Sequence, residues 1–296
     1  GQSIREDGPT WHLSKQGTPT MGGLMFILGI GIAVLTAGWE DLQNGLHNHL
    51  VVFLFALVFG AIGFVDDLQK LRHHANEGLT APQKFLLQLA AAIAFTVLLR
   101  RDGYLTPDLY IPFLNVEIVG IPWVVFMVFA AFVMVGTVNA VNITDGIDGL
   151  ATGVTMPVML FFTAVACFWG QLELGIFSAG LYGGLCGFLI YNLHPAKVFM
   201  GDTGSLFLGG AVCGLAFALD IPLVLILVGI IYILETLSDI LQVGYFKLTH
   251  GKRIFRMAPL HHHLELGGWS EVKLFCVFSG VTLLACVLAF LGVMGR

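Results

Sequence analysis

Nine apolar stretches, each close to the length of a membrane-spanning helix, constrain this chain more than any other feature. They run near residues 20–38, 49–65, 83–99, 121–138, 150–170, 174–192, 203–219, 221–243 and 270–294. A helix needs about 20 apolar residues to cross the roughly 30 Å hydrocarbon core of a bilayer. With 57% hydrophobic residues and a mean hydropathy of +0.87, the chain is also too apolar for a water-soluble globule of 296 residues. We therefore predict an all-α polytopic membrane protein with about nine transmembrane helices.

The chain reads as a single integral-membrane domain over residues 1–296. No internal repeat, low-complexity tract or polar linker marks a second domain, and Gly1 opens a polar stretch without a signal peptide. The five cysteines all lie in apolar spans without metal-ligand spacing, which favours buried free thiols. Residues 100–120 alternate apolar and polar side chains around Asn115 and predict a small β-hairpin. The net charge of −5 gives no sign of a nucleic-acid partner.

The basic residues indicate the orientation of the chain in a membrane. If the N-terminal segment is cytoplasmic, eleven of the 14 Lys and Arg residues fall in inward loops. The outward loops keep only Arg100, Arg101 and Arg296. Because Lys and Arg concentrate in cytoplasmic loops of membrane proteins, this asymmetry predicts a cytoplasmic N-terminal segment and an external C-terminus and hairpin.

The polar motifs of the loops all fall on the predicted cytoplasmic face. They are KQGTPTMGG (15–23), DDLQK (66–70), Lys84, NAVNITDGIDG (139–149), YNLHPAKVFMGDTGS (191–205) and APLHHHLE (258–265). Each has a simpler explanation by itself: Asp202 as a helix cap, the TDGIDG segment as a turn before a capped helix, and the histidines as a solvated loop. Those explanations do not account for the fact that all of these motifs lie on the same face of the membrane. Their gathering on one face instead predicts a functional site.

The acidic residues of these motifs suit a metal ion. Asp66 and Asp67 follow an apolar helix whose C-terminus already carries partial negative charge, so they need a cationic partner. Mg²⁺ prefers one or two carboxylates and completes its shell with water and phosphate oxygens, and Asp66, Asp67 and Asp202 are candidate ligands. Lys70, Lys84 and the histidines are candidates to spread the charge of a transferring phosphoryl group. A zinc site at the three adjacent histidines is disfavoured, because adjacent side chains seldom converge on one tetrahedral ion.

In the order and spacing of its motifs, the chain resembles the phospho-N-acetylmuramoyl-pentapeptide transferases over essentially its whole length. The resemblance rests on GQSIREDGP, HLSKQGTPTMGG, FVDDLQK, NAVNITDGIDGLA, YNLHPAKVFMGDTGSL and PLHHHLE. The paired aspartates and GDTGS alone indicate the wider superfamily of polyprenyl-phosphate N-acetylhexosamine-1-phosphate transferases. GTPTMGG together with PLHHHLE favours the muramoyl-pentapeptide branch. Members usually have ten transmembrane helices, so the family's first helix is expected to be absent from this chain.

The resemblance implies a reaction and its setting. Phospho-N-acetylmuramoyl-pentapeptide would pass from UDP-N-acetylmuramoyl-pentapeptide to undecaprenyl phosphate, giving lipid I and UMP for peptidoglycan synthesis. A Mg²⁺ cofactor and a homodimer are implied as well. The expected location is the bacterial cell membrane, with the active site on the cytoplasmic face, so that a lipid and a cytoplasmic substrate can meet.

The resemblance also implies site residues by matching position. Asp202 is the implied metal ligand, with Asp67 a second candidate, and we assign Asp66 as the candidate base. The uridine would be bound by Lys15, Asn142, Asp145, Gly146, Asp148 and Phe199. The phosphates and sugar would be surrounded by Lys70, Lys84, Asn192, Ser205 and the histidines, of which His261 and His262 are also catalytic candidates and His263 a substrate-binding one.

Two other functions stay open at this point. One is a transferase of the same superfamily that uses UDP-N-acetylglucosamine for other surface polymers. The second is a transporter whose polar residues near the membrane midplane bind a solute. Charged residues within the spans are few, and the main cases, Glu235 and Asp239, lie on one helix toward its inward end, which disfavours the transporter.

Overall fold

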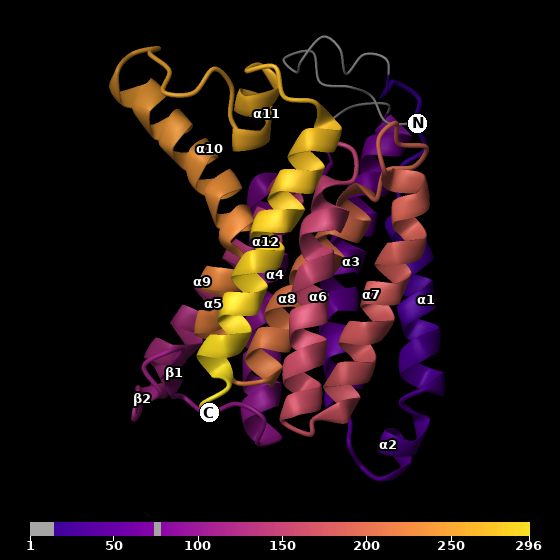
Figure 1. Ribbon diagram of the computed structural model, residues 1–296, viewed down its shortest axis with the longest axis vertical. Helices are drawn as coiled ribbons and strands as arrows, with labels where there is room; N and C mark the ends of the chain where they lie inside the picture. Colours follow the sequence, from indigo (N-terminus) through magenta and orange to yellow (C-terminus); the bar gives the residue numbers. More distant parts are fainter. Residues whose placement is uncertain (1–14, 74–77) are drawn as a thin grey trace.

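A computed structural model describes residues 15–73 and 78–296, which are almost entirely helical (Figure 1). The helices are α1 (Gly23–Thr36), α2 (Trp39–Gln43), α3 (Asn48–His73), α4 (Ala81–Arg101), α5 (Trp123–Thr144), α6 (Leu150–Phe168), α7 (Leu172–Asn192), α8 (Gly201–Ala218), a 3-10 turn (Pro222–Val224), α9 (Leu225–Val228), α10 (Ile230–Leu248), α11 (Leu260–Glu265) and α12 (Glu271–Val293). Every apolar stretch predicted above contains helix, so the all-α prediction is confirmed. The motif GQSIREDGP and the basic residue Arg5 lie outside the described residues.

Seven of the described helices are long and apolar enough to cross a membrane. An eighth span results if Pro222–Val228 and Ile230–Leu248 are counted together, although this pair is bent by 79° at its break. Helix α1 has 14 residues, which at 1.5 Å per residue give about 21 Å, less than the roughly 30 Å of a hydrocarbon core. The chain is a multi-pass membrane protein in which the first predicted span, residues 20–38, is a shorter apolar helix.

The predicted hairpin is present between α4 and α5. Strand β1 (Leu109–Ile111) pairs antiparallel with β2 (Val116–Ile118), and Asn115 in the connecting turn has a positive φ of 51°. The turn packs on the end of α12, where the N–H of Phe113 donates to the carbonyl of Gly292 at 2.9 Å. The hairpin and the C-terminus therefore lie together at one end of the bundle, shown at the bottom of Figure 1.

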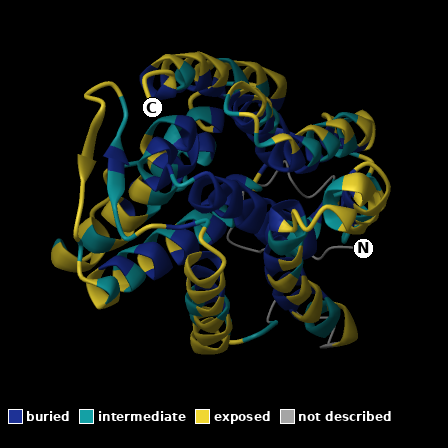
Figure 2. Ribbon diagram, turned by 90° about the horizontal axis from the view of Figure 1, so that it is seen from below, coloured by how far each residue is buried: buried dark blue, intermediate teal, exposed yellow. Residues whose placement is uncertain are grey.

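Helix α8 is the buried centre of the bundle, and nearly all of its residues are inaccessible. Figure 2 shows this arrangement end-on, with buried faces turned inward and exposed faces on the outside. Glycines let its neighbours approach closely: a Cβ on Gly209 would lie 2.6 Å from Cα of Val138 in α5, and one on Gly63 in α3 would lie 2.1 Å from the carbonyl oxygen of Asp202. Small residues serve this purpose in membrane helices. The close contact of α3 with the start of α8 positions the site described next.

Candidate active site

The predicted site residues gather at the end of the bundle opposite the hairpin. Helices α3, α5, α7 and α10 end there, and α4, α6, α8 and α12 begin there. Segments that are far apart in sequence thus place their polar residues side by side. Two clusters of ionised groups form, one between α3 and α8 and the other around the loop that joins α5 to α6.

The first cluster consists of three carboxylates. One oxygen atom from each of Asp66, Asp67 and Asp202 lies within 4.8 Å of the other two. Asp66 and Asp67 are 1% and 5% exposed, whereas the Asp202 side chain is 18% exposed. Carboxylates this close repel one another strongly unless cations compensate their charge. Asp202 is the member of the cluster that a ligand can reach most easily.

Two lysines supply that compensation. Lys70 Nζ lies 2.6 Å from Asp66 Oδ2 and 3.0 Å from Asp202 Oδ2. Lys84 Nζ lies 2.6 Å from Asp202 Oδ2 and 3.1 Å from Asp66 Oδ2. Lys70 follows Asp66 by one helical turn, a spacing that brings side chains together, and Lys84 is held by the first turn of α4, which begins at a capping box of Thr80 and Gln83. Three carboxylates and two ammonium groups leave a net negative charge, which suits a further cation.

Asn142 and Ser205 hold the Asp202 carboxylate from its other side. Asn142 Nδ2 donates to Asp202 Oδ1 at 3.0 Å and to Ser205 Oγ at 2.8 Å. The Ser205 hydroxyl in turn donates to the carbonyl of Gly201 at 3.1 Å. Gly201 has a φ of +71°, and a Cβ there would lie 2.6 Å from Asp67 Oδ2, so only glycine fits at the start of the GDTGS motif.

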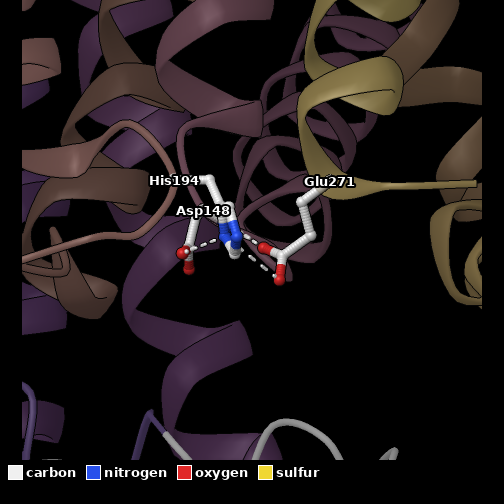
Figure 3. Close-up of side chains that lie close together, drawn as sticks. All are labelled: Asp148, His194 and Glu271. Carbon is white, nitrogen blue, oxygen red and sulfur yellow. Dashed lines mark hydrogen bonds and ion pairs between the residues drawn. The ribbon is translucent and has the colours of Figure 1, made fainter.

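The second cluster joins four segments around Asp148 (Figure 3). Lys15 Nζ lies 2.7 Å from Asp148 Oδ1 and 2.6 Å from Glu271 Oε2. The Asp148 N–H donates to Glu271 Oε2 at 2.9 Å, and His194 Nδ1 lies 2.9 Å from Asp148 Oδ2. Burial raises the pKa of the Asp148 carboxyl, but the hydrogen bond from Lys15, the N–H of Ala196 and the Lys15 charge outweigh it and bring this pKa below its usual value. The carboxylate is therefore held ionised.

Sequence reasoning placed Lys15 and Asp148 in the site but missed His194 and Glu271. Glu271 is the first residue of α12, where an acidic side chain is explained by the helix dipole alone. His194 lies within the quoted motif YNLHPAKVFMGDTGS but was not singled out. The sequence feature that could have indicated both Glu271 and His194 is the position of an ionisable residue at the polar end of an apolar span.

Asp145 lies in the loop that leads from α5 to Asp148. Among residues 15–73 and 78–296, no side chain or backbone N–H makes a hydrogen bond or ion pair with its carboxylate in the structure. Removal from water, followed by the charges of Asp202, Asp67 and Asp148, raises the pKa of Asp145 well above its usual value. The fold therefore disfavours the ionised form of Asp145.

The three histidines do not lie in a solvated loop. His261 is 1% exposed, and its Nδ1 lies 2.8 Å from Glu235 Oε2. His262 Nδ1 lies 2.7 Å from Glu265 Oε2, and His263 Nδ1 accepts the N–H of Arg256 at 3.1 Å. His261 and His263 therefore anchor α11 to α10 and to the loop before it, whereas the His262 contact lies within α11.

Two predicted residues serve as framework of the loop before α8. Asn192 is 1% exposed; its Oδ1 accepts the Thr152 hydroxyl at 2.8 Å and its Nδ2 donates to the carbonyl of Val198 at 3.0 Å. The backbone of Phe199 pairs with the GTPTMGG segment, since its N–H donates to the carbonyl of Pro19 at 2.8 Å. The structure thus shows how these two residues shape the loop, while their contact with a substrate remains a prediction.

This fold and this site define a membrane-embedded transferase, and comparison with known proteins agrees. Residues 49–220 match the family described as glycosyl transferase family 4, and residues 15–27 match signature 1 of phospho-N-acetylmuramoyl-pentapeptide-transferase. The chain belongs to the phospho-N-acetylmuramoyl-pentapeptide-transferase family. The resemblance read from the motifs is thereby confirmed.

Three relatives that carry the name phospho-N-acetylmuramoyl-pentapeptide-transferase illustrate the similarity. The protein of Clostridium acetobutylicum is 49% identical over 293 residues, which cover 98% of this chain and 89% of the relative. The protein of Clostridium botulinum (strain Alaska E43 / Type E3) is 48% identical over 297 residues, which cover 98% of this chain and 87% of the relative. That of Listeria monocytogenes is 45% identical over 289 residues, covering 98% and 88%.

Proposed function

We propose that this protein transfers phospho-N-acetylmuramoyl-pentapeptide from UDP-N-acetylmuramoyl-pentapeptide to undecaprenyl phosphate, releasing UMP and forming lipid I. The observation that carries the proposal is the cluster of Asp66, Asp67 and Asp202 with Lys70 and Lys84 at one end of a membrane bundle. Such a cluster can bind phosphates and a cation next to the lipid headgroups. Membership of the family supports this substrate pair over UDP-N-acetylglucosamine and over solute transport.

The cluster fits a magnesium ion by its chemistry. Its donors are carboxylate oxygens, the ligands that Mg²⁺ prefers, and its net charge is negative. Asp202 is the proposed ligand because it is the most exposed of the three carboxylates, and Asp67 is the second candidate. When bound, Mg²⁺ would stabilise negative charge that develops on the donor's diphosphate.

The protein's own groups have separate proposed tasks. Lys70 and Lys84, now paired with Asp202, would turn to the phosphates and offset their charge. Lys15, which is held by Glu271, and Asp148 would hydrogen-bond the uridine. Asn142, Asp145, Gly146 and Phe199 would lie around it. Ser205, Asn192, His261, His262 and His263 would line the phosphates and the sugar.

The proposed setting is the bacterial cell membrane with the clusters at its cytoplasmic surface. The strong excess of Lys and Arg at that end supports this orientation. The homodimer that the resemblance implies belongs to the same proposal. Light scattering of the purified protein in detergent tests the homodimer directly.

A direct assay tests the reaction. Purified protein in detergent is mixed with undecaprenyl phosphate, Mg²⁺ and either UDP-N-acetylmuramoyl-pentapeptide or UDP-N-acetylglucosamine, and UMP release is measured. We expect UMP only with the muramoyl-pentapeptide donor, and none when the lipid is omitted. UMP release with UDP-N-acetylglucosamine alone would favour the other transferase, and no release with either donor would contradict both.

A further inference from the structure

Glu235 is a buried carboxylate in the bent eighth candidate span, outside both clusters. It lies on α10 and is 0% exposed. An ionisable side chain in a membrane-spanning segment is costly, so it is normally paired and retained for a function. In the sequence, Glu235 is one of the few charged residues within the apolar spans. The proposed function assigns it no role.

The Glu235 carboxylate contacts both the ring and the backbone N–H of His261. Glu235 Oε2 lies 2.8 Å from His261 Nδ1, and the backbone N–H of His261 donates to Oε1 at 3.2 Å and to Oε2 at 3.4 Å. The contact joins α10 to α11, and both side chains are almost fully buried. Glu235 therefore fixes the backbone and the ring of His261 together.

A bond at Nδ1 determines what the other ring nitrogen can do. When a carboxylate accepts Nδ1–H, the ring orientation is set and Nε2 is left to bind a different group. In the described part of the chain, His261 Nε2 is buried and has no hydrogen-bond partner. Buried polar atoms are rarely left unsatisfied, so an unpartnered one at this end of the bundle indicates a missing ligand.

The direction of Nε2 is given by Gly146. A Cβ on this glycine would lie 2.2 Å from His261 Nε2, closer than any real contact, so the imidazole edge lies directly against the backbone of Gly146. The same loop carries Asp145 and Asp148. Nε2 is therefore directed at the loop on which the proposed function places the uridine of the donor.

We propose that Glu235 is a positioning residue, which holds His261 so that Nε2 hydrogen-bonds the donor substrate over the Gly146 loop. The inference rests on the proposed function, because the donor is the ligand it assigns to Nε2. Glu235 itself touches no substrate and acts only through His261.

Kinetics of Glu235→Gln, His261→Ala and the double variant test the inference. Glutamine keeps the size of glutamate but removes its negative charge and replaces one acceptor oxygen by an NH₂ donor, so it holds the two N–H groups of His261 less firmly. We expect kcat to fall by about 10- to 100-fold, the loss usual for an orienting partner, with KM for the donor changed less than about threefold. In the His261→Ala background, Glu235→Gln should change kcat less than about twofold, because residues that act as one unit are not additive.

A second variant covers the case in which Glu235→Gln does not fold. Gly146→Ala leaves Glu235 intact but displaces the His261 ring, so it should lower kcat. In the His261→Ala background, Gly146→Ala should change kcat much less than it does in the wild-type protein. The matched control is Glu173→Gln, a buried glutamate at the start of α7 near the opposite end of the bundle, which should keep wild-type kcat.

The outcomes separate this inference from the function on which it rests. No UMP release by the wild-type protein would overturn the proposed function and the inference with it. An active wild type together with wild-type kcat in Glu235→Gln, or losses of Glu235→Gln and His261→Ala that multiply, would overturn the inference alone.

Discussion

Asp67 caps helix α8 through Thr203, whose N–H and hydroxyl lie 2.9 and 2.7 Å from Asp67 Oδ2. The N–H of Asp202 adds a third bond to Asp67 Oδ1 at 3.2 Å. Met200, at the N-cap position of α8, supplies no side-chain bond, so the cap comes from α3. This leaves the Asp202 carboxylate free for the lysines, and the explanation of Asp202 as a simple helix cap is excluded. The two aspartates therefore have different tasks.

Replacing Asp202 should raise the Mg²⁺ requirement of the reaction. In Asp202→Asn, the Mg²⁺ concentration for half-maximal activity should rise by about 10- to 100-fold or more, since even outer-shell partners of a metal cost that much. Most activity should be lost at ordinary Mg²⁺ levels. A titration of UMP release against Mg²⁺ gives the answer. The same rate and the same Mg²⁺ requirement as wild type would rule out metal binding by Asp202.

Asp67→Asn is the matched comparison. An amide can keep only part of the cap, and loss of a helix cap costs about 0.5–2 kcal/mol. Thermal unfolding should therefore shift downward in Asp67→Asn, while its Mg²⁺ requirement should rise less than that of Asp202→Asn. An equal rise in the Mg²⁺ requirement of the two variants would contradict the separate tasks assigned here.

Glu271→Gln should weaken donor binding. It removes one of the two carboxylates that hold Lys15, so the Lys15 ammonium loses its fixed direction. We expect KM for UDP-N-acetylmuramoyl-pentapeptide to rise by about tenfold, as for one lost charge-assisted bond of roughly 1.5 kcal/mol, with a smaller change in kcat. Steady-state kinetics measure both. Lys273→Gln, two residues along α12 with its ammonium over the Trp269 ring at 4.1 Å, is the control and should behave as wild type.

Asp145→Asn should stabilise the protein at neutral pH. The pKa of Asp145 is higher in the folded state than in the unfolded state. At pH values between these two pKa values the folded protein binds the proton more tightly than the unfolded protein does. The free energy of unfolding therefore falls as pH rises through this range. At neutral pH the charged form is penalised in the fold, and its removal should raise the melting temperature by roughly 2–4 °C without Mg²⁺. The gain should shrink as pH falls toward about 4, near the unfolded pKa.

Asp148→Asn should have the opposite effect. The pKa of Asp148 is lowered in the folded state, so its charge contributes stability above the unfolded pKa, and that stability is lost as pH falls through the folded value. Its replacement should lower the melting temperature at neutral pH. Shifts of the same sign in both variants would contradict the electrostatic account of this loop.

Features of the fold and of the site that depend on neighbouring residues could be predicted from the sequence, whereas contacts between segments far apart in the chain could not. The spans, the hairpin around Asn115 and the pairing of Asp66 with Lys70 follow from local composition, alternation and helical spacing. The contacts of Lys15 with Glu271 and of Glu235 with His261 do not, because each joins segments whose relative positions are set by the packing of the whole bundle. The break at Gly229, which bends the eighth span by 79°, lies in an apolar run that reads as continuous.

Asp66 is the candidate base, and the structure gives it a defined environment. Its Oδ1 accepts the N–H of Leu79 at 2.8 Å, and its Oδ2 pairs with Lys70 and Lys84. A carboxylate is a weak base in general, but the second pKa of a phosphate monoester lies near 6, so a weak base is enough for undecaprenyl phosphate. The same contacts disfavour Asp66 as a nucleophile, because a covalent route needs an oxygen free to attack the donor phosphate.

We therefore predict direct attack by the lipid phosphate, with Asp66 accepting its proton. Asp66→Asn should bind UDP-N-acetylmuramoyl-pentapeptide about normally, turn over slowly, and regain rate as pH rises, because more of the lipid phosphate then ionises without help. The decisive measurement mixes wild-type enzyme with labelled donor in the absence of lipid. Direct attack predicts no UMP, since no acceptor is present. Stoichiometric UMP with a labelled phospho-sugar trapped on Asp66 or Asp67 would instead establish a two-step route through an aspartyl intermediate.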